Sequence, residues 1–143
     1  MTNYSHILVG IDLSDESQQV LSRATALATA NQASLTLVHV VEPLTFAYGG
    51  DIPVDLSEIQ EQLYSQATIQ LAKLAAPFNI SPDNQSILIG QPVAEIQDFA
   101  ENIGADLIVV GSHGRKGLAR LLGSTANGVL HGAKLDVLAI RVK

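Results

Sequence analysis

The chain has 143 residues, no cysteine and a formal net charge of −6, from 8 lysine and arginine residues against 14 aspartate and glutamate residues. This length fits a single domain, residues 1–143, and the acidic balance argues against a nucleic-acid surface, because a phosphate backbone requires clustered cations. Neither a signal peptide nor a run of roughly 20 apolar residues is present, so the sequence predicts a cytoplasmic protein that does not engage a membrane.

Strand-like and helix-like apolar patterns alternate along the chain, beginning with a strand. The run HILVGIDL, residues 6–13, is almost continuously apolar and rich in branched side chains, which is typical of a buried parallel strand. Ser14 then stands at the expected N-cap of a helix, with Asp15 and Glu16 in its first turn, where acidic side chains complement the helix dipole. This helix is expected to end near Asn31.

The middle of the chain predicts a strand, a long loop and a second helix. Residues 33–41, ASLTLVHVV, form the strand, and residues 42–54, with two prolines and little periodicity, form a surface loop of a length that often carries function. Asp55 and Glu58 make a capping pair for a helix that ends close to Pro77. The residues expected on its inward face are Leu56, Ile59, Leu63, Ala67, Leu71 and Leu74.

Two further strands and two helices are predicted before the last strand. Residues 85–90, QSILIG, form the third strand, and Pro92 opens a helix that ends before Gly104. Residues 105–111, ADLIVVG, form the fourth strand, and a short helix is expected over residues 124–133. The inward residues of the helix that begins at Pro92 are Val93, Ile96, Phe99, Ala100 and Ile103.

A fifth strand, residues 136–142, completes an alternation that covers the whole chain. Strands this apolar must be covered on both faces, so the sequence predicts an open, doubly wound α/β fold with a parallel sheet between helices. In such sheets a ligand binds beyond the carboxyl ends of the strands, where the strand order reverses. The residues expected at these ends are Ile11, Asp12, Val40, Val41, Gly90 and Gly111.

The segment GSHGRKGLARLLGST, residues 111–125, gathers glycines, cations and hydroxyls at this edge. Glycine allows close approach of the backbone to a bound group, and Ser124 and Thr125 stand at an expected helix start, where free amides favour an anion. The segment matches neither the phosphate loop that ends in Gly-Lys-Ser/Thr nor the dinucleotide pattern G-x-G-x-x-G. An ordinary glycine-rich connection is the alternative to a phosphate site.

Three stretches of the chain resemble the universal stress protein family: HILVGIDLS at the start, LTLVHVVEP in the second strand, and ADLIVVGSHGRKGLARLLGST near the end. The last is the most specific, since the nucleotide-binding branch of that family carries G-x2-G-x9-G-[ST]. Eight residues separate Gly114 from Gly123 here, one fewer than in the pattern. The resemblance implies a five-stranded sheet of order 3-2-1-4-5 and a bound ATP, with or without Mg2+.

The resemblance also implies roles for individual residues. Asp12 lies near adenine and ribose, and Val40 lines the adenine pocket through its main chain. We expect His113 to contact phosphate or to orient the loop. The alternatives are a helix-entry role for Asp12, a plain core position for Val40 and solvated loop side chains for His113 and Arg115. The implied nucleotide-binding set is Ile11, Asp12, Val40, Gly111, His113, Gly114, Arg115, Gly123, Ser124 and Thr125.

These residues favour a binding and signalling module, a dimeric universal stress protein that binds ATP and changes a surface seen by an unidentified protein partner. The homodimer is implied to form through the last strand, which begins near Val137 and ends near Val142, because an open apolar edge invites pairing. A slow ATP hydrolase and a ligand-free dimeric scaffold are the rivals. No activated nucleophile with a base is visible, so no catalytic residue is assigned, and His39 and His113 without a third ligand predict no metal site.

Overall fold

The computed structural model describes residues 3–43, 56–111, 129 and 134–141. Five strands form one parallel sheet in the order β3-β2-β1-β4-β5, which confirms the predicted fold class and strand order. The strands are β1 (His6–Gly10), β2 (Ser34–Val41), β3 (Gln85–Ile89), β4 (Leu107–Gly111) and β5 (Asp136–Ile140). Each begins and ends within two residues of the predicted bounds, apart from β1, which leaves the sheet three residues earlier than expected.

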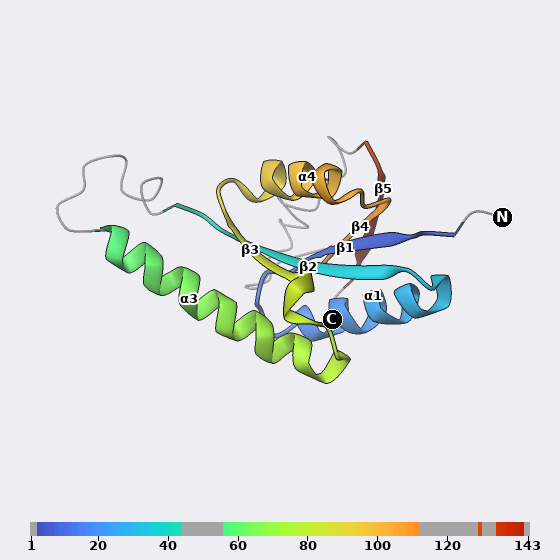
Figure 1. Ribbon diagram of the computed structural model, residues 1–143, viewed down its shortest axis with the longest axis horizontal. Helices are drawn as coiled ribbons and strands as arrows, with labels where there is room; N and C mark the ends of the chain where they lie inside the picture. Colours follow the sequence, from blue (N-terminus) through green and yellow to red (C-terminus); the bar gives the residue numbers. More distant parts are fainter. Residues whose placement is uncertain (1–2, 44–55, 112–128, 130–133, 142–143) are drawn as a thin grey trace.

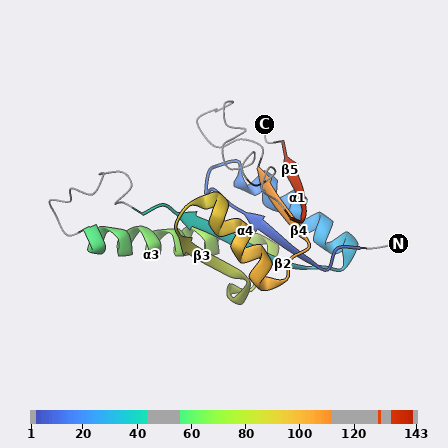
Figure 2. The same cartoon turned by 90° about the horizontal axis from the view of Figure 1, so that it is seen from above.

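Helices cover both faces of the sheet (Figure 1). One face carries α1 (Ser17–Asn31), which packs against β1 and β4, and α3 (Leu56–Ala75), which packs against β2 and β3. The other face carries α4 (Pro92–Ile103), which packs against β2 and is seen from above in Figure 2. Two short 3-10 turns, Ala76–Phe78 and Pro82–Asn84, join α3 to β3. None of the described helices is long and apolar enough to cross a membrane.

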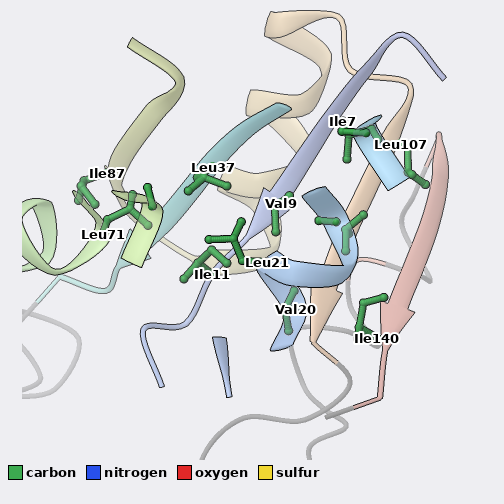
Figure 3. Close-up of a cluster of buried hydrophobic side chains, with 14 of the residues drawn as sticks. Ile7, Val9, Ile11, Val20, Leu21, Leu37, Leu71, Ile87, Leu107 and Ile140 are labelled. Carbon is green, nitrogen blue, oxygen red and sulfur yellow. The ribbon is translucent and has the colours of Figure 1, made fainter. Parts of the chain in front are cut away.

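The buried side chains form two clusters, one on each face, because neighbouring residues of a strand point to opposite sides. Ile7 and Val9 of β1 belong to the cluster under α1 and α3, whereas Leu8 between them belongs to the cluster under α4. Figure 3 shows Leu21 of α1 beside Ile11 in the first cluster. Burial on both faces explains why the strands are almost continuously apolar in sequence.

The start of α1 differs from the prediction. Its N-cap is Glu16, without a side-chain cap, and the helix begins at Ser17 with no acidic residue in its first turn. Ser14 is therefore not the N-cap. The reason is a turn between strand and helix, in which Leu13 takes a left-handed φ of 60° and the Ser14 carbonyl accepts a 3.0 Å hydrogen bond from the Ser17 amide. The end at Asn31 is as predicted.

The prediction of the inward face of α3 is confirmed for only part of the helix. Ala67 and Leu71 are buried as predicted, but Ile59 and Leu63 are 41% and 36% exposed. The amino-terminal half of α3 reaches past the end of the sheet (Figure 1), so none of the described strands lies beneath it. For α4 the prediction is confirmed, because Pro92 opens the helix and Gly104 ends it with a left-handed φ of 73°.

Side chains close the amino-terminal edge of the sheet. The Asp106 carboxylate accepts hydrogen bonds from the Ser5 amide at 2.9 Å and the His6 amide at 3.0 Å. The Tyr4 hydroxyl donates to Asp136 at 2.7 Å, and the Tyr4 amide donates to Asn31 at 3.1 Å. Burial raises the pKa of Asp106, but the amides that donate to its carboxylate outweigh burial and hold the pKa below its ordinary value.

Candidate functional site

The candidate site lies at the carboxyl end of β1. The chain adds β2 and β3 on one side of β1 and β4 and β5 on the other, so the strand order reverses between β1 and β4. Ile7 pairs with Leu107 and Val9 with Val109, and continuing this register by two residues brings Ile11 level with Gly111. The paired residues end at Val9, and the extended register directs Ile11 and Gly111, both expected at strand ends, to the switch point, where doubly wound sheets bind ligands.

Close packing of α4 against β1 begins one residue earlier, at Gly10. A Cβ on this residue would lie 3.2 Å from Ile96 of α4 and 3.3 Å from Val110 of β4. Both distances are tighter than most real Cβ contacts, so a larger residue would have to push the helix or its neighbouring strand away. Gly10 therefore helps to set the distance of α4 from the strand that leads into the site.

Ile11 is the residue at which β1 leaves the sheet. Its side chain is buried, and its amide donates a 2.8 Å hydrogen bond to the Val38 carbonyl. Its own carbonyl lies 2.6 Å from Nδ1 of His39. Because a carbonyl oxygen only accepts, the His39 ring donates this bond. Ile11 is thus bonded to β2 through both of its main-chain groups. Its amide bonds to the main chain of Val38, and its carbonyl bonds to the side chain of His39.

Asp12 organises the turn that follows. One carboxylate oxygen, Oδ1, accepts three hydrogen bonds, from the Ser14 amide at 2.9 Å, the Ser14 hydroxyl at 2.6 Å and the Ser17 hydroxyl at 2.9 Å. Both serines are buried, whereas Asp12 is exposed. Within the described ranges no hydrogen bond reaches its second oxygen, Oδ2. The helix-entry interaction with Ser14 is therefore present, and it uses half of the carboxylate.

Leu13 connects Asp12 to Ser14 through a left-handed backbone conformation, with φ of 60°. A residue other than glycine in this region costs of the order of 1–3 kcal/mol, and such strain gathers at functional sites. The three hydrogen bonds to Asp12 offset that cost and hold the turn. The result is a rigid corner at the mouth of the switch point.

Val40 turns its main chain toward the same corner. Its side chain is 9% exposed and packs in the cluster under α4, which agrees with a core position for the side chain. The main-chain groups of successive residues in β2 point alternately to β1 and to β3. Those of Val38 point to β1 and those of His39 to β3, so the amide and carbonyl of Val40 again point toward β1. The ladder with β1 ends at Gly10 opposite Val38, however, one step before Val40 would join it.

The other strand ends are closed or only partly described. At the end of β3, Gly90 has a φ of 154°, and a Cβ there would lie 2.7 Å from the Glu95 carboxylate, so the Glu95 side chain covers this position. Gly111 ends β4 and pairs with Ile140 of β5. The remaining predicted site residues lie outside the described part of the chain and stay predictions: His113, Gly114, Arg115, Gly123, Ser124 and Thr125.

Two contributors were missed by the sequence analysis. His39 was considered only as a metal ligand, yet it acts as a hydrogen-bond donor to Ile11, 28 residues away. Ser17 was not considered at all, although its buried hydroxyl contacts Asp12. A serine shortly after a strand-end aspartate is a usable signal, because both can share a turn. The residues described include no group of three or more His, Cys, Asp or Glu that could hold a metal ion.

Comparison with known proteins identifies the family to which this sequence is similar. The model of the universal stress protein family matches residues 3–141. Universal stress protein A homolog 1 of Coxiella burnetii is 42% identical over 143 residues, covering 99% of both chains. Universal stress protein A homolog 2 of the same organism is 44% identical over 147 residues, covering 100% of this chain and 99% of the relative.

Solved structures of similar sequence share the fold. Universal stress protein UspA from Lactobacillus plantarum is 28% identical, with a TM-score of 0.79 and coverage of 99% of this chain and all (100%) of that one. A universal stress protein solved in complex with cAMP is 27% identical, with a TM-score of 0.65 and coverage of 98% of both chains. That second protein binds an adenine nucleotide.

Proposed function

Because the chain belongs to the universal stress protein family, we propose that it is a cytoplasmic, dimeric module that binds ATP and reports its occupancy to a protein partner. The observation that carries the proposal is the corner after β1. There the strand order reverses, and Val40 directs its main chain toward the side on which β1 runs. Among the described residues, one oxygen of the Asp12 carboxylate accepts no hydrogen bond. The relative that was solved with cAMP supports an adenine nucleotide as the ligand class.

The base and the ribose bind at this corner. The Val40 amide donates to N1 of adenine and the Val40 carbonyl accepts from the N6 amino group, the same pair of groups that a neighbouring strand would use. Oδ2 of Asp12 accepts a hydrogen bond from a ribose hydroxyl, while Oδ1 remains bound to Ser14 and Ser17. A carboxylate accepts two such bonds without rearranging, because its oxygens have separate lone pairs.

The phosphates bind along the glycine segment. Gly111 begins that segment at the end of β4, level with Ile11. We assign the phosphate contacts, from the sequence, to amides and side chains of the segment: Gly111, His113, Gly114, Arg115, Gly123, Ser124 and Thr125. A magnesium ion would arrive on the phosphate oxygens, the usual arrangement for Mg2+.

Thermal unfolding with and without ATP and Mg2+ tests the proposal. A ligand that binds the native state selectively raises its stability by about 2.7 kcal/mol at 100 times Kd. Gly114→Val, which adds a branched side chain to the glycine segment, is expected to abolish the shift while melting normally without nucleotide. No shift for the unmodified protein at millimolar ATP would instead favour the ligand-free scaffold.

The dimer forms through the outer edge of β5. This strand is the last in the sheet, and Leu138 on it is 38% exposed. A regular apolar edge pairs readily with a second copy, whereas a lysine at such an edge opposes pairing. Leu138→Lys is expected to give monomers in sedimentation velocity. Ile69→Lys, at a residue of α3 that is 55% exposed, is the matched control and should leave the dimer intact. Dimers in both variants would contradict this interface.

A further inference from the structure

We infer that His39 is a positioning residue that holds the Ile11 carbonyl in place of the Val40 amide and so gives the nucleotide base access to the main chain of Val40. The inference rests on the proposed function and adds a determinant of base selectivity to it. It starts from one contact, the 2.6 Å hydrogen bond between Nδ1 of His39 and the Ile11 carbonyl.

The register shows what this contact replaces. Gly10 pairs with Val38, and the Ile11 amide continues the ladder by donating to the Val38 carbonyl. In a parallel ladder the next bond runs from the Val40 amide to the Ile11 carbonyl. The described backbone pairing contains no such bond, and the His39 ring takes the carbonyl instead. A side chain of β2 thus occupies the acceptor that its own main chain would otherwise use.

The hydrogen bond from the His39 ring, in place of one from the Val40 amide, explains how β1 can leave the sheet at this point. A part-buried carbonyl left without a donor costs roughly 1–3 kcal/mol, which would favour one more step of ladder. With His39 donating to it, Ile11 is satisfied and the chain can turn through the left-handed Leu13 into the Asp12 corner. The Val40 amide and carbonyl still point toward the side on which β1 runs, but the paired register of β1 ends at Gly10, before it reaches them.

The base is recognised by the order of its donors and acceptors. Along the edge that pairs with another base, adenine presents an amino donor beside a ring-nitrogen acceptor, and guanine presents a carbonyl acceptor beside a ring N–H donor. A fixed pair of one amide and one carbonyl therefore distinguishes the two purines once the ring orientation is set. If the Val40 amide returned to Ile11, the site would lose its donor to the base but would keep the glycine segment that binds phosphate.

Three substitutions at His39 separate positioning from packing. His39→Asn places an amide nitrogen close to the position of Nδ1 and should preserve the hydrogen bond to Ile11. His39→Leu keeps much of the volume without a donor, and His39→Gln moves the donor one bond farther out. Titration calorimetry with ATP, GTP and inorganic tripolyphosphate measures base and phosphate recognition separately.

We expect the unmodified protein and the Asn variant to prefer ATP to GTP. In the Leu and Gln variants the ratio of the two affinities should be about tenfold smaller, the equivalent of one hydrogen bond. Affinity for tripolyphosphate should stay the same in all four proteins. An unchanged preference in the Leu variant, or the same loss in the Asn and Leu variants, would overturn the inference. If the unmodified protein binds tripolyphosphate but no nucleotide, base recognition fails; if it binds none of the three, the proposed function fails with it.

A measurement without ligand tests the contact itself. The hydrogen bond requires the proton on Nδ1 in the neutral ring, leaving Nε2 as an acceptor. Two-bond 1H–15N NMR correlations of the unmodified, nucleotide-free protein distinguish the two tautomers directly. The Nδ1–H pattern for His39 is the expected result. An Nε2–H pattern would overturn the inference even if every variant failed to fold.

Discussion

The amino-terminal edge of the sheet, where the strands begin, and the carboxyl edge, where they end, differ in how their polar groups are paired. At the amino-terminal edge, Asp106 accepts two backbone amides and Tyr4 bonds to Asn31 and Asp136. At the carboxyl edge, β1 leaves the sheet after Ile11, and the hydrogen bonds that Asp12 accepts from described residues all reach one of its oxygens. Among the described residues, the amino-terminal edge thus pairs its polar groups with atoms of the fold, whereas one oxygen of Asp12 at the carboxyl edge accepts no hydrogen bond.

The geometry of a parallel α/β sheet accounts for the direction of this difference. Each helix that returns from a strand begins at the carboxyl edge, as α1 does after β1 and α4 does after β3. The free amides and positive dipole ends of these helices therefore gather where the strands end, and they favour an anion. Substitutions at the closed edge should change stability alone, and substitutions at the open edge should change ligand binding.

The largest effect is expected for Asp106→Ala. It removes the acceptor of two backbone amides and should lower the free energy of unfolding by roughly 1.5–3 kcal/mol, the range for hydrogen bonds to a charged group. Urea titration measures the loss. Asp106→Asn, which keeps one carbonyl acceptor, should lose less. Loss of the ATP-induced thermal shift in refolded Asp106→Ala protein would break the distinction between the edges.

Asp12→Ala should show the opposite balance. The loss of three hydrogen bonds on an exposed carboxylate should cost about 1–2 kcal/mol, and the shift with ATP should fall sharply. Thermal unfolding with and without ATP gives both quantities. Asp15→Ala, at an exposed carboxylate three positions further along the chain, is the control and should change neither. Equal ATP shifts in the two variants would remove Asp12 from the site.

Acid should weaken the closed edge. The pKa of Asp106 in the folded protein lies below its ordinary value of 3.8, so its contribution is present above that pH and is lost as the pH falls through the lower, folded value. As the pH falls below 3.8, the urea midpoint of the unmodified protein should therefore drop more steeply than that of Asp106→Asn. Parallel curves for the two proteins would show that Asp106 is not the cause.

The smallest effect is expected at Tyr4. Its hydrogen bond to Asp136, with minor help from burial and nearby carboxylates, raises its pKa above the ordinary value of 10.0. The stabilisation is complete below that pH and is lost as the pH rises through the higher, folded value. NMR titration of the tyrosine ring carbons should show that Tyr4 ionises at a higher pH in the unmodified protein than in the Asp136→Asn variant. Identical titrations would mean that the hydroxyl does not donate to Asp136.

Local patterns predicted most of the elements but not where the layers end. The stripe of α3 has helical spacing along its whole length, yet Ala67 is buried and Ile59 is 41% exposed. The amino-terminal part of the helix reaches past the end of the sheet (Figure 1). The N-cap rule placed a helix start at Ser14 because a serine precedes acidic residues. It failed because Leu13 turns the chain first, and a left-handed leucine leaves no mark in the sequence.

The sequence by itself determined the alternation of strands and helices, the burial of strands on both faces, and the choice of Val41 and Gly111 as strand ends. These properties depend on the spacing of apolar residues and on turn residues within a few positions. Only the tertiary structure brought His39 to Ile11 across 28 residues and Asp106 to His6 across 100. Such contacts depend on strand register, which is set by how the helices pack between the strands and not by any neighbouring residue.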